Sequence, residues 1–181
     1  MLFSCFPAVA LLAIAIHGAG HILAAATVGM RFGRLRLTAT GLRLLSDQPY
    51  PSYRAEALVA LGGPLFNLVS AALVYAHLQG CDFVLLSLYL GLLNLLPLRG
   101  FDGGTLLLCF LCDRHALFPS LSPRTAERII SAISALVLML LWLAAVYLLL
   151  RRGSALSLYV FCLQLFRSVF VEARERFDAN F

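Results

Sequence analysis

Two histidines stand close together inside an apolar run near the start of the chain. The run is AIAIHGAGHILAAA, residues 13–26, and it contains His17 and His21. On an α-helix, residues i and i+4 lie on one face, one turn apart, so both imidazoles would point the same way. Two imidazoles at this spacing can share one tetrahedral metal ion. The alternative is a pair of packed histidines that bond to backbone carbonyls, which is the usual arrangement in a soluble core.

A carboxylate beside a second apolar stretch is the candidate for a third ligand. Asp102 stands in the segment NLLPLRGFDGG, after a run of leucines that Pro97 and Gly100 interrupt. By itself, an aspartate beside glycines is more often a turn residue that bonds nearby amides. Together with the histidine pair, it indicates a His–His–Asp site of the kind that binds zinc.

The composition places these residues in a lipid bilayer. Of the 181 residues, 61% are hydrophobic and only 13% are charged, and the mean hydropathy is +0.91. A soluble domain of this length cannot bury so much apolar surface, so most of it must face lipid. Ionisable side chains inside a membrane are usually functional, which favours a joint role for the histidines. All 14 cationic side chains are Arg, scattered at segment ends, which predicts contacts with lipid headgroups and no nucleic-acid partner.

Five apolar stretches predict an all-α polytopic membrane protein with about five transmembrane helices. Most of them approach the roughly 20 residues that a helix needs to cross the hydrocarbon. The third is short, and Pro97, Gly100 and the Gly103–Gly104 pair are expected to break it. A break at membrane depth is tolerated only where protein or a water-filled cavity receives the backbone groups, which predicts an internal site there. The stretches cover about residues 2–28, 56–78, 83–97, 128–150 and 154–171.

Between the first two stretches, apolar and Arg residues alternate. In the segment 31–45, Leu35 and Leu37 alternate with Arg34 and Arg36. A period of two predicts a strand or a hairpin, with Gly41 near the turn, and we expect this β element to lie at the membrane interface. Farther on, residues 113–128 are predicted to form a polar loop, in which Ser122–Pro123 or Thr125 begins the next helix.

The distribution of Arg predicts the topology. The loops 29–55 and 98–128 and the tail from residue 167 hold twelve Arg, whereas the opposing loops hold two. Because cytoplasmic loops carry the excess of cations, the N-terminus is expected outside and the C-terminus in the cytosol. No Lys or Arg precedes Arg31, and the first apolar run exceeds the roughly 7–15 residues of a signal-peptide core. We therefore expect this run to be a retained transmembrane helix.

Three ordered motifs resemble those of the site-2 protease family of intramembrane zinc metalloproteases, most closely its small bacterial sporulation-type members. HGAGH resembles the family's HExxH, ALGGPLFNLVSAAL its G-P-x-x-N stretch, and NLLPLRGFDGG its N-x-x-P…D-G motif, across roughly residues 10–110. The resemblance implies that His17, His21 and Asp102 are the zinc ligands. It also implies that Asn67 and Asn94 lie near the substrate or the zinc-bound water.

The resemblance further implies an activity and a location. Family members cleave transmembrane or membrane-proximal polypeptides, and segment 31–45 would hold such a substrate in extended form by adding a strand to it. We expect a zinc-binding membrane core over residues 1–112, and a C-terminal helical membrane segment of the same domain over residues 113–181. The expected location is the bacterial cytoplasmic membrane, with multiple spans. The oligomeric state stays open.

Gly18 departs from the family's pattern. It stands where HExxH has its Glu, the general base beside the zinc. A positioned general base contributes about 10²–10⁴-fold to a rate, and glycine has no side chain to do so. We therefore assign no catalytic base and expect very slow peptide hydrolysis. The small residues between the histidines can also serve close helix packing, which is compatible with a lost base.

Two other functions remain open from the sequence. A pseudoprotease would bind transmembrane partners without cutting them, as the missing Glu suggests. A bis-histidine haem or transport protein is disfavoured, because haem ligation needs imidazoles on opposite faces of one iron. The CxxC pair, Cys109 and Cys112, lies in an apolar run, which favours small core residues over metal or redox chemistry.

Overall fold

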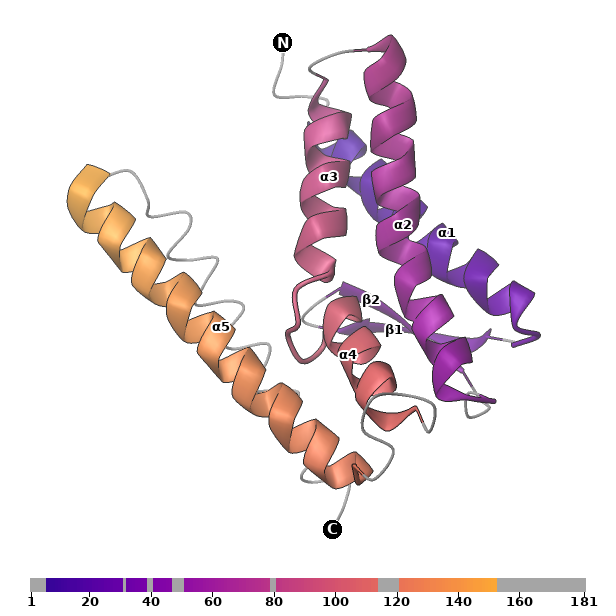
Figure 1. Ribbon diagram of the computed structural model, residues 1–181. Helices are drawn as coiled ribbons and strands as arrows, with labels where there is room; N and C mark the ends of the chain where they lie inside the picture. The colour runs from indigo at the N-terminus through magenta and orange to yellow at the C-terminus, as the bar shows by residue number, and fades with distance from the viewer. Residues whose placement is uncertain are drawn as a thin grey trace.

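The computed structural model describes residues 6–30, 32–38, 41–46, 51–78, 81–113 and 121–152. Within these ranges the chain forms helices and one two-stranded sheet (Figure 1). The helices are α1 (Phe6–Thr27), α2 (Tyr53–His77), α3 (Asp82–Asn94), α4 (Asp102–Cys112) and α5 (Pro123–Arg152), and the strands are β1 (Phe32–Thr38) and β2 (Gly41–Ser46).

Helices α1, α2 and α5 are long and apolar enough to cross a membrane, so the chain is an integral membrane protein. Helices α3 and α4 are shorter, with 13 and 11 residues. At 1.5 Å per residue they measure about 20 and 17 Å, less than the roughly 30 Å of a hydrocarbon core. The predicted apolar stretch at 154–171 lies outside the described residues. The total of about five spans therefore stays a prediction.

Helix α2 is the centre of the helical core, because it packs against α1, α3 and α4. It begins after Ser52, whose Oγ accepts a hydrogen bond from the backbone N–H of Ala55 at 3.1 Å. This N-cap satisfies one of the free donors of the first turn. The fold thus gives α2 neighbours on several sides, and its buried residues face them.

Two glycines bring α1 and α2 into backbone contact. A Cβ on Gly20 would meet the carbonyl oxygen of Gly62 and would lie 2.9 Å from Cβ of Phe66. A Cβ on Gly62 would lie 2.5 Å from the carbonyl oxygen of Gly20 and 2.8 Å from Cβ of Ala24. Small residues allow membrane helices to approach this closely. The packing interpretation of the small residues in HGAGH therefore applies to Gly20.

The strands β1 and β2 form an antiparallel pair with Thr38 opposite Gly41. The pairing is irregular between Phe32 and Arg34. This pair occupies the stretch in which the alternation predicts a strand or hairpin. Its position at the membrane interface stays a prediction.

The predicted break after α3 is a loop that covers residues 95–101. Gly100 in this loop has a φ of +89°, the left-handed region that favours glycine. The prediction that Gly103 and Gly104 also break the helix is wrong, because both are buried in the first turn of α4. A Cβ on either residue would collide with carbonyl oxygens of the loop. These two glycines therefore allow α4 to pack directly against the loop that precedes it.

Helix α5 begins at Pro123, one of the two predicted starts. Proline suits the first helical position, where its missing N–H would have no helical partner. Ser122 precedes it, and its Oγ accepts a hydrogen bond from the backbone N–H of Thr125 at 3.2 Å. The predicted polar loop at 113–128 is therefore shorter, since its last residues are helical. Helix α5 packs against α4 and extends away from the other helices (Figure 1).

Candidate metal centre

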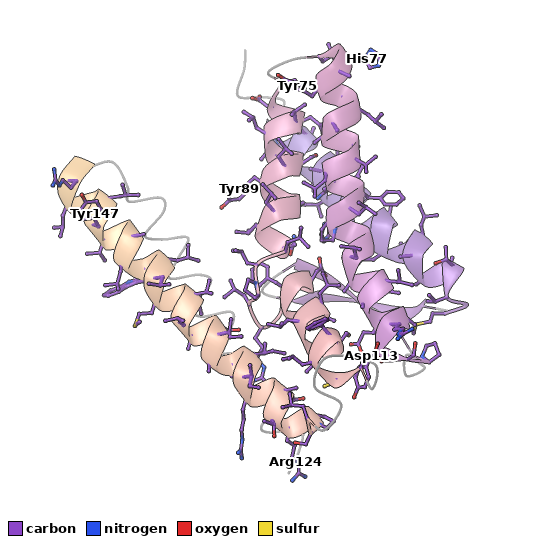
Figure 2. The ribbon with its side chains drawn as sticks, in the orientation of Figure 1. Tyr75, His77, Tyr89, Asp113, Arg124 and Tyr147 are labelled. Atoms are coloured by element: carbon purple, nitrogen blue, oxygen red, sulfur yellow. The ribbon has the colours of Figure 1, made fainter. Side chains whose placement is uncertain are left out.

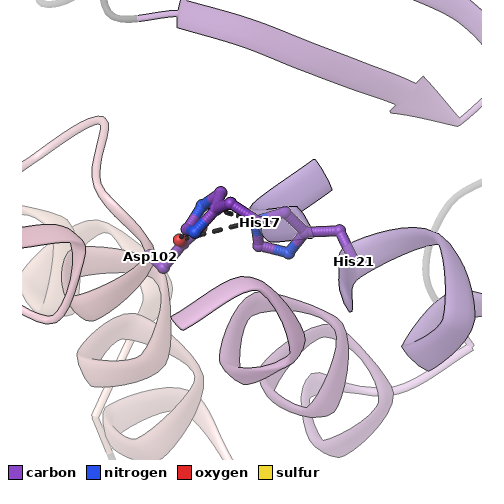
Figure 3. Close-up of side chains that lie close together, drawn as sticks. All are labelled: His17, His21 and Asp102. Carbon is purple, nitrogen blue, oxygen red and sulfur yellow. Dashed lines mark hydrogen bonds and ion pairs between the residues drawn. The ribbon is translucent and has the colours of Figure 1, made fainter. Parts of the chain in front are cut away.

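The two histidines of α1 and the first residue of α4 meet in one cluster (Figure 3). Nε2 of His17 lies 3.1 Å from Nε2 of His21. Oδ2 of Asp102 lies 3.2 Å from Nε2 of His17 and 3.5 Å from Nε2 of His21. All three side chains are partly buried, with 15–20% of their surface exposed. The fold thus brings together residues that are more than 80 positions apart in the chain.

These three distances match one face of a metal tetrahedron. Zinc bonds to nitrogen and oxygen measure about 2.0–2.1 Å, which places neighbouring ligand atoms of a tetrahedron about 3.3 Å apart. The separations of 3.1, 3.2 and 3.5 Å bracket that value. Oδ2 of Asp102 is buried, and among the described residues its polar neighbours are the two Nε2 atoms, neither of which makes a well-aligned hydrogen bond with it. A buried carboxylate oxygen with poorly aligned hydrogen bonds is costly, and a divalent cation between the three atoms would lower that cost. The donor set therefore fits zinc.

The neutral ring of His21 is held in the tautomer that a metal ligand requires. Its Nδ1 lies 2.7 Å from the backbone carbonyl oxygen of Val59. Because a carbonyl only accepts, Nδ1 carries the proton and donates it, and Nε2 of the neutral ring keeps its lone pair. That nitrogen is the one that faces His17 and Asp102. Hydrogen bonds of this kind orient metal-ligating histidines in proteins.

His17 has a fully buried amide as its partner. Nδ2 of Asn67 lies 3.3 Å from Nδ1 of His17, and Oδ1 of Asn67 has no hydrogen-bond partner among the described residues. When Nδ2 donates, Nδ1 of His17 accepts and its Nε2 carries the proton. When the amide turns by 180°, Oδ1 accepts from Nδ1–H and Nε2 is free to bind a metal. The structure thus places Asn67 against His17, and its predicted position near the substrate or the zinc-bound water stays a prediction.

One face of α2 supports both imidazoles. Val59, Gly63 and Asn67 are spaced four residues apart and lie along this face. A Cβ on Gly63 would meet Nε2 of His21, and it would lie 2.7 Å from Cε1 of His21 and 2.8 Å from Cε1 of His17. Only glycine allows both rings to lie directly on the helix. We did not predict Val59 or Gly63 as site residues. The Gly-Gly-Pro stretch could have indicated Gly63. The role of Val59 rests on its backbone carbonyl, and because every residue has one, the sequence contains no signal for it.

Gly18 differs from the other glycines of the site. Apart from its chain neighbours and the backbone of its own helix, no described atom lies within 4 Å of the position that a Cβ on Gly18 would take. Packing therefore does not require a glycine here, and a larger side chain has room to leave the helix. The other carboxylates of the described residues do not belong to the cluster of His17, His21 and Asp102. They are Glu56, Asp82, Asp113 and Glu127.

The remaining candidates lie outside this cluster. Nδ2 of Asn94 donates to the carbonyl oxygen of Leu90 in its own helix at 3.0 Å, and its predicted role near the substrate stays a prediction. His77 stands at the far end of α2 (Figure 2). His115, the fourth histidine of the chain, lies outside the described residues. Cys109 is buried and, like Cys112, is a free thiol.

Comparison with solved structures finds a protein of similar fold. The fold is similar to that of the "Site-2 Protease from Methanocaldococcus jannaschii", with a TM-score of 0.66 and 20% sequence identity. The match covers 91% of this chain and 75% of that protein. No family model matches the chain, and no curated protein matches it. The resemblance seen in the three motifs is thus confirmed at the level of the fold, which is that of a site-2 protease.

Proposed function

We propose that this chain is a zinc-binding intramembrane protein of the site-2 protease type that binds membrane-embedded polypeptides and hydrolyses them very slowly. The observation that carries the proposal is the convergence of two Nε2 atoms and Oδ2 of Asp102 beside an open position at Gly18. The ligand set is complete, whereas the position of the general base has no side chain. The protein that is similar in fold is named as a protease, which supports the same activity class.

Each residue of the cluster has a defined task in this proposal. His17, His21 and Asp102 hold the zinc ion, which would supply Lewis-acid chemistry when bound. Val59 and Asn67 orient the two imidazoles through their Nδ1 atoms. Because position 18 is glycine, it has no carboxylate to accept a proton from water and pass it to the leaving amine. A general base usually accelerates a reaction by about 10²–10⁴-fold, so its loss slows cleavage by the same factor.

The proposed substrate is a transmembrane or membrane-proximal polypeptide. Peptide bonds inside a helix are already hydrogen-bonded, so a substrate must be held in extended form before it can be cut. The β1–β2 pair presents strand edges to which an extended segment could add by backbone hydrogen bonds. We place the protein in the bacterial cytoplasmic membrane with its C-terminus in the cytosol, as the distribution of Arg suggests.

The test restores the missing group. Gly18→Glu places a carboxylate beside the cluster, and Gly18→Gln is its isosteric control without a base. Both variants and the native chain are purified, reconstituted in liposomes with zinc, and incubated with a panel of single-span peptides. We expect Gly18→Glu to cut about 10²–10⁴-fold faster than the native chain, and Gly18→Gln to cut no faster than it.

Zinc content is measured on the same samples. The native chain should bind zinc and His17→Ala should not. Zinc-loaded Gly18→Glu that cuts no peptide of the panel would count against the protease assignment. Native protein as fast as Gly18→Glu would show that the base is supplied from elsewhere.

A pseudoprotease is the second candidate, and the missing side chain at Gly18 favours it. In this case the native chain captures single-span peptides and releases them uncut. Capture that persists in His17→Ala would show that binding does not need the metal and would support this candidate. Failure to capture any single-span peptide would speak against it.

A further inference from the structure

Helix α5 contacts the loop that leads into Asp102, the third of the proposed zinc ligands. Asp102 follows directly on the loop of residues 95–101, and this loop makes polar and apolar contacts with one face of α5. Residues at positions i, i+4, i+7 and i+11 lie along one side of a helix. The α5 residues that contact the loop have this spacing. They are Glu127, Ser131, Ser134 and Leu138.

Ser134 joins two peptide groups of the loop. The backbone N–H of Arg99 donates to Oγ of Ser134 at 2.9 Å, and this Oγ donates to the carbonyl oxygen of Pro97 at 3.4 Å. Ser134 is only 1% exposed, so water cannot take the place of its hydroxyl. Removal of a buried partner leaves both peptide groups with the full cost of their lost hydrogen bonds.

The side chain of Arg99 continues the contact along α5. Its Nη1 donates to Oγ of Ser131 at 2.7 Å, and its Nη2 lies 3.5 Å from Oε2 of Glu127. Oγ of Ser131 in turn donates to the carbonyl oxygen of Glu127 at 2.8 Å. Hydrogen bonds from a guanidinium are stronger than those between neutral groups. The loop is therefore tied to α5 through both the backbone and the side chain of one residue.

Apolar contacts close the same interface. Leu98 is fully buried, and it forms a core cluster with Phe101 and with Leu138 of α5. The buried Gly103 and Gly104 of α4 also lie against carbonyl oxygens of the loop. The loop and the first turn of α4 thus form one packed unit. A shift of the loop relative to α5 must also shift the carboxylate at the start of α4.

The two histidines have a different support. They lie on α1 and are held by the face of α2 that contains Val59, Gly63 and Asn67. A zinc ion in the cluster would therefore join side chains with different supports, the histidines on α1 and Asp102 at the start of α4. Helix α4 itself packs against α2 on one hand and α5 on the other, so zinc affinity depends on how both contacts place Asp102.

We propose that Ser134, assisted by Ser131, positions Asp102 for metal binding, so that the docking of α5 and the occupancy of the metal site are coupled. This inference rests on the zinc site proposed above. Coupling between two equilibria is reciprocal: if α5 contacts strengthen zinc binding, zinc must strengthen the α5 contacts by the same factor. Both serines are positioning residues, since neither contacts the three ligand side chains in the structure.

The first test measures zinc affinity in the full chain, in detergent micelles, by competition with a chromophoric chelator. Ser134→Ala should bind zinc about tenfold more weakly, as loss of groups that orient ligands typically costs 10–100-fold. Ser87→Ala is the matched control, because Ser87 is 0% exposed and its Oγ has no hydrogen-bond partner among the described residues. This control should stay within about twofold of the native affinity, a difference too small to reflect ligand geometry.

Two further readouts separate positioning from general loss of stability. Ser131→Ala should weaken zinc binding and Ser131→Thr, which keeps a hydroxyl, should restore it. The visible spectrum of the cobalt(II) form should change in Ser134→Ala and not in Ser87→Ala, because it reports on the ligands around the ion. Equal cobalt spectra and equal zinc affinities for the native chain and Ser134→Ala would overturn the inference.

The second test uses hydrogen exchange and addresses the reciprocal effect. Without metal, amides of residues 98–105 should exchange faster in Ser134→Ala than in Ser87→Ala. In the native chain, zinc should slow exchange of residues 127–138, and Ser134→Ala should lose this protection. A native chain that binds no zinc would overturn both this inference and the proposed function. A native chain that binds zinc, with no change in Ser134→Ala, would overturn this inference alone.

Discussion

Gly63 offers a direct test of how the imidazoles lie on α2, through the substitution Gly63→Ala. The added Cβ would meet Nε2 of His21, and it would lie 2.7 Å from Cε1 of His21 and 2.8 Å from Cε1 of His17. Ordinary contacts of a Cβ begin at 3.4 Å, so both rings must retreat. The two rings cannot move away without moving the two Nε2 atoms that face Asp102.

The size of the effect follows from the tolerance of a metal site. Ligand distances in a working site stay within about 0.2 Å of their ordinary values. The retreat of Cε1 of His21 from 2.7 to at least 3.4 Å is several times larger. Overpacking of this kind costs about 1–3 kcal/mol, and 1.4 kcal/mol corresponds to a tenfold change in affinity. We therefore expect Gly63→Ala to weaken zinc binding by about 10–100-fold.

Gly18→Ala is the matched control, because its Cβ meets no described atom within 4 Å. Both substitutions replace a helical glycine by alanine, so they share the intrinsic helix gain of about 1 kcal/mol. Zinc affinity is measured for the native chain and both variants by chelator competition, and helix content by circular dichroism. Gly18→Ala should bind zinc like the native chain. Native-like affinity in Gly63→Ala would refute the placement of the rings against α2.

Three further outcomes are expected. Asn67→Leu should weaken zinc binding by about 10–100-fold, because zinc binding at Nε2 of His17 leaves the proton on Nδ1, which then needs an acceptor at position 67. Asn67→Asp, whose ionised carboxylate accepts this proton's hydrogen bond, should retain tight binding. Zinc affinity at constant pH checks both variants. Gly62→Leu should lower the free energy of unfolding by about 1–3 kcal/mol or more, measured by denaturation in detergent, because its Cβ would lie 2.5 Å from the carbonyl oxygen of Gly20. Zinc at 100 times its dissociation constant should raise the free energy of unfolding by about 2.7 kcal/mol. The measurement is the rise in melting temperature on addition of zinc, and His21→Ala should abolish this rise.

Much of the helical core could be predicted from apolar stretches and their interruptions. The predicted stretches at 56–78 and 128–150 fall within or close to α2 and α5, whose bounds are Tyr53–His77 and Pro123–Arg152. The role of Gly103 and Gly104 was predicted incorrectly, because glycine in sequence signals either a helix break or a close contact. Only the position of the loop carbonyls decides between the two. Gly20 and Gly18 pose the same ambiguity within one motif, and the packing of α2 resolves it.

The chemistry of the site divides in the same way. The sequence alone determined that His17 and His21 share a helix face, because a spacing of four is a local property of the α-helix. It also determined that position 18 has no base, since glycine has no side chain in any fold. Only the tertiary structure decided that Asp102 comes within 3.2 and 3.5 Å of the two Nε2 atoms. The same holds for the carbonyl of Val59 and the amide of Asn67, which face the Nδ1 atoms. These contacts join residues from different helices, and their distances depend on how the helices pack, which no local pattern specifies.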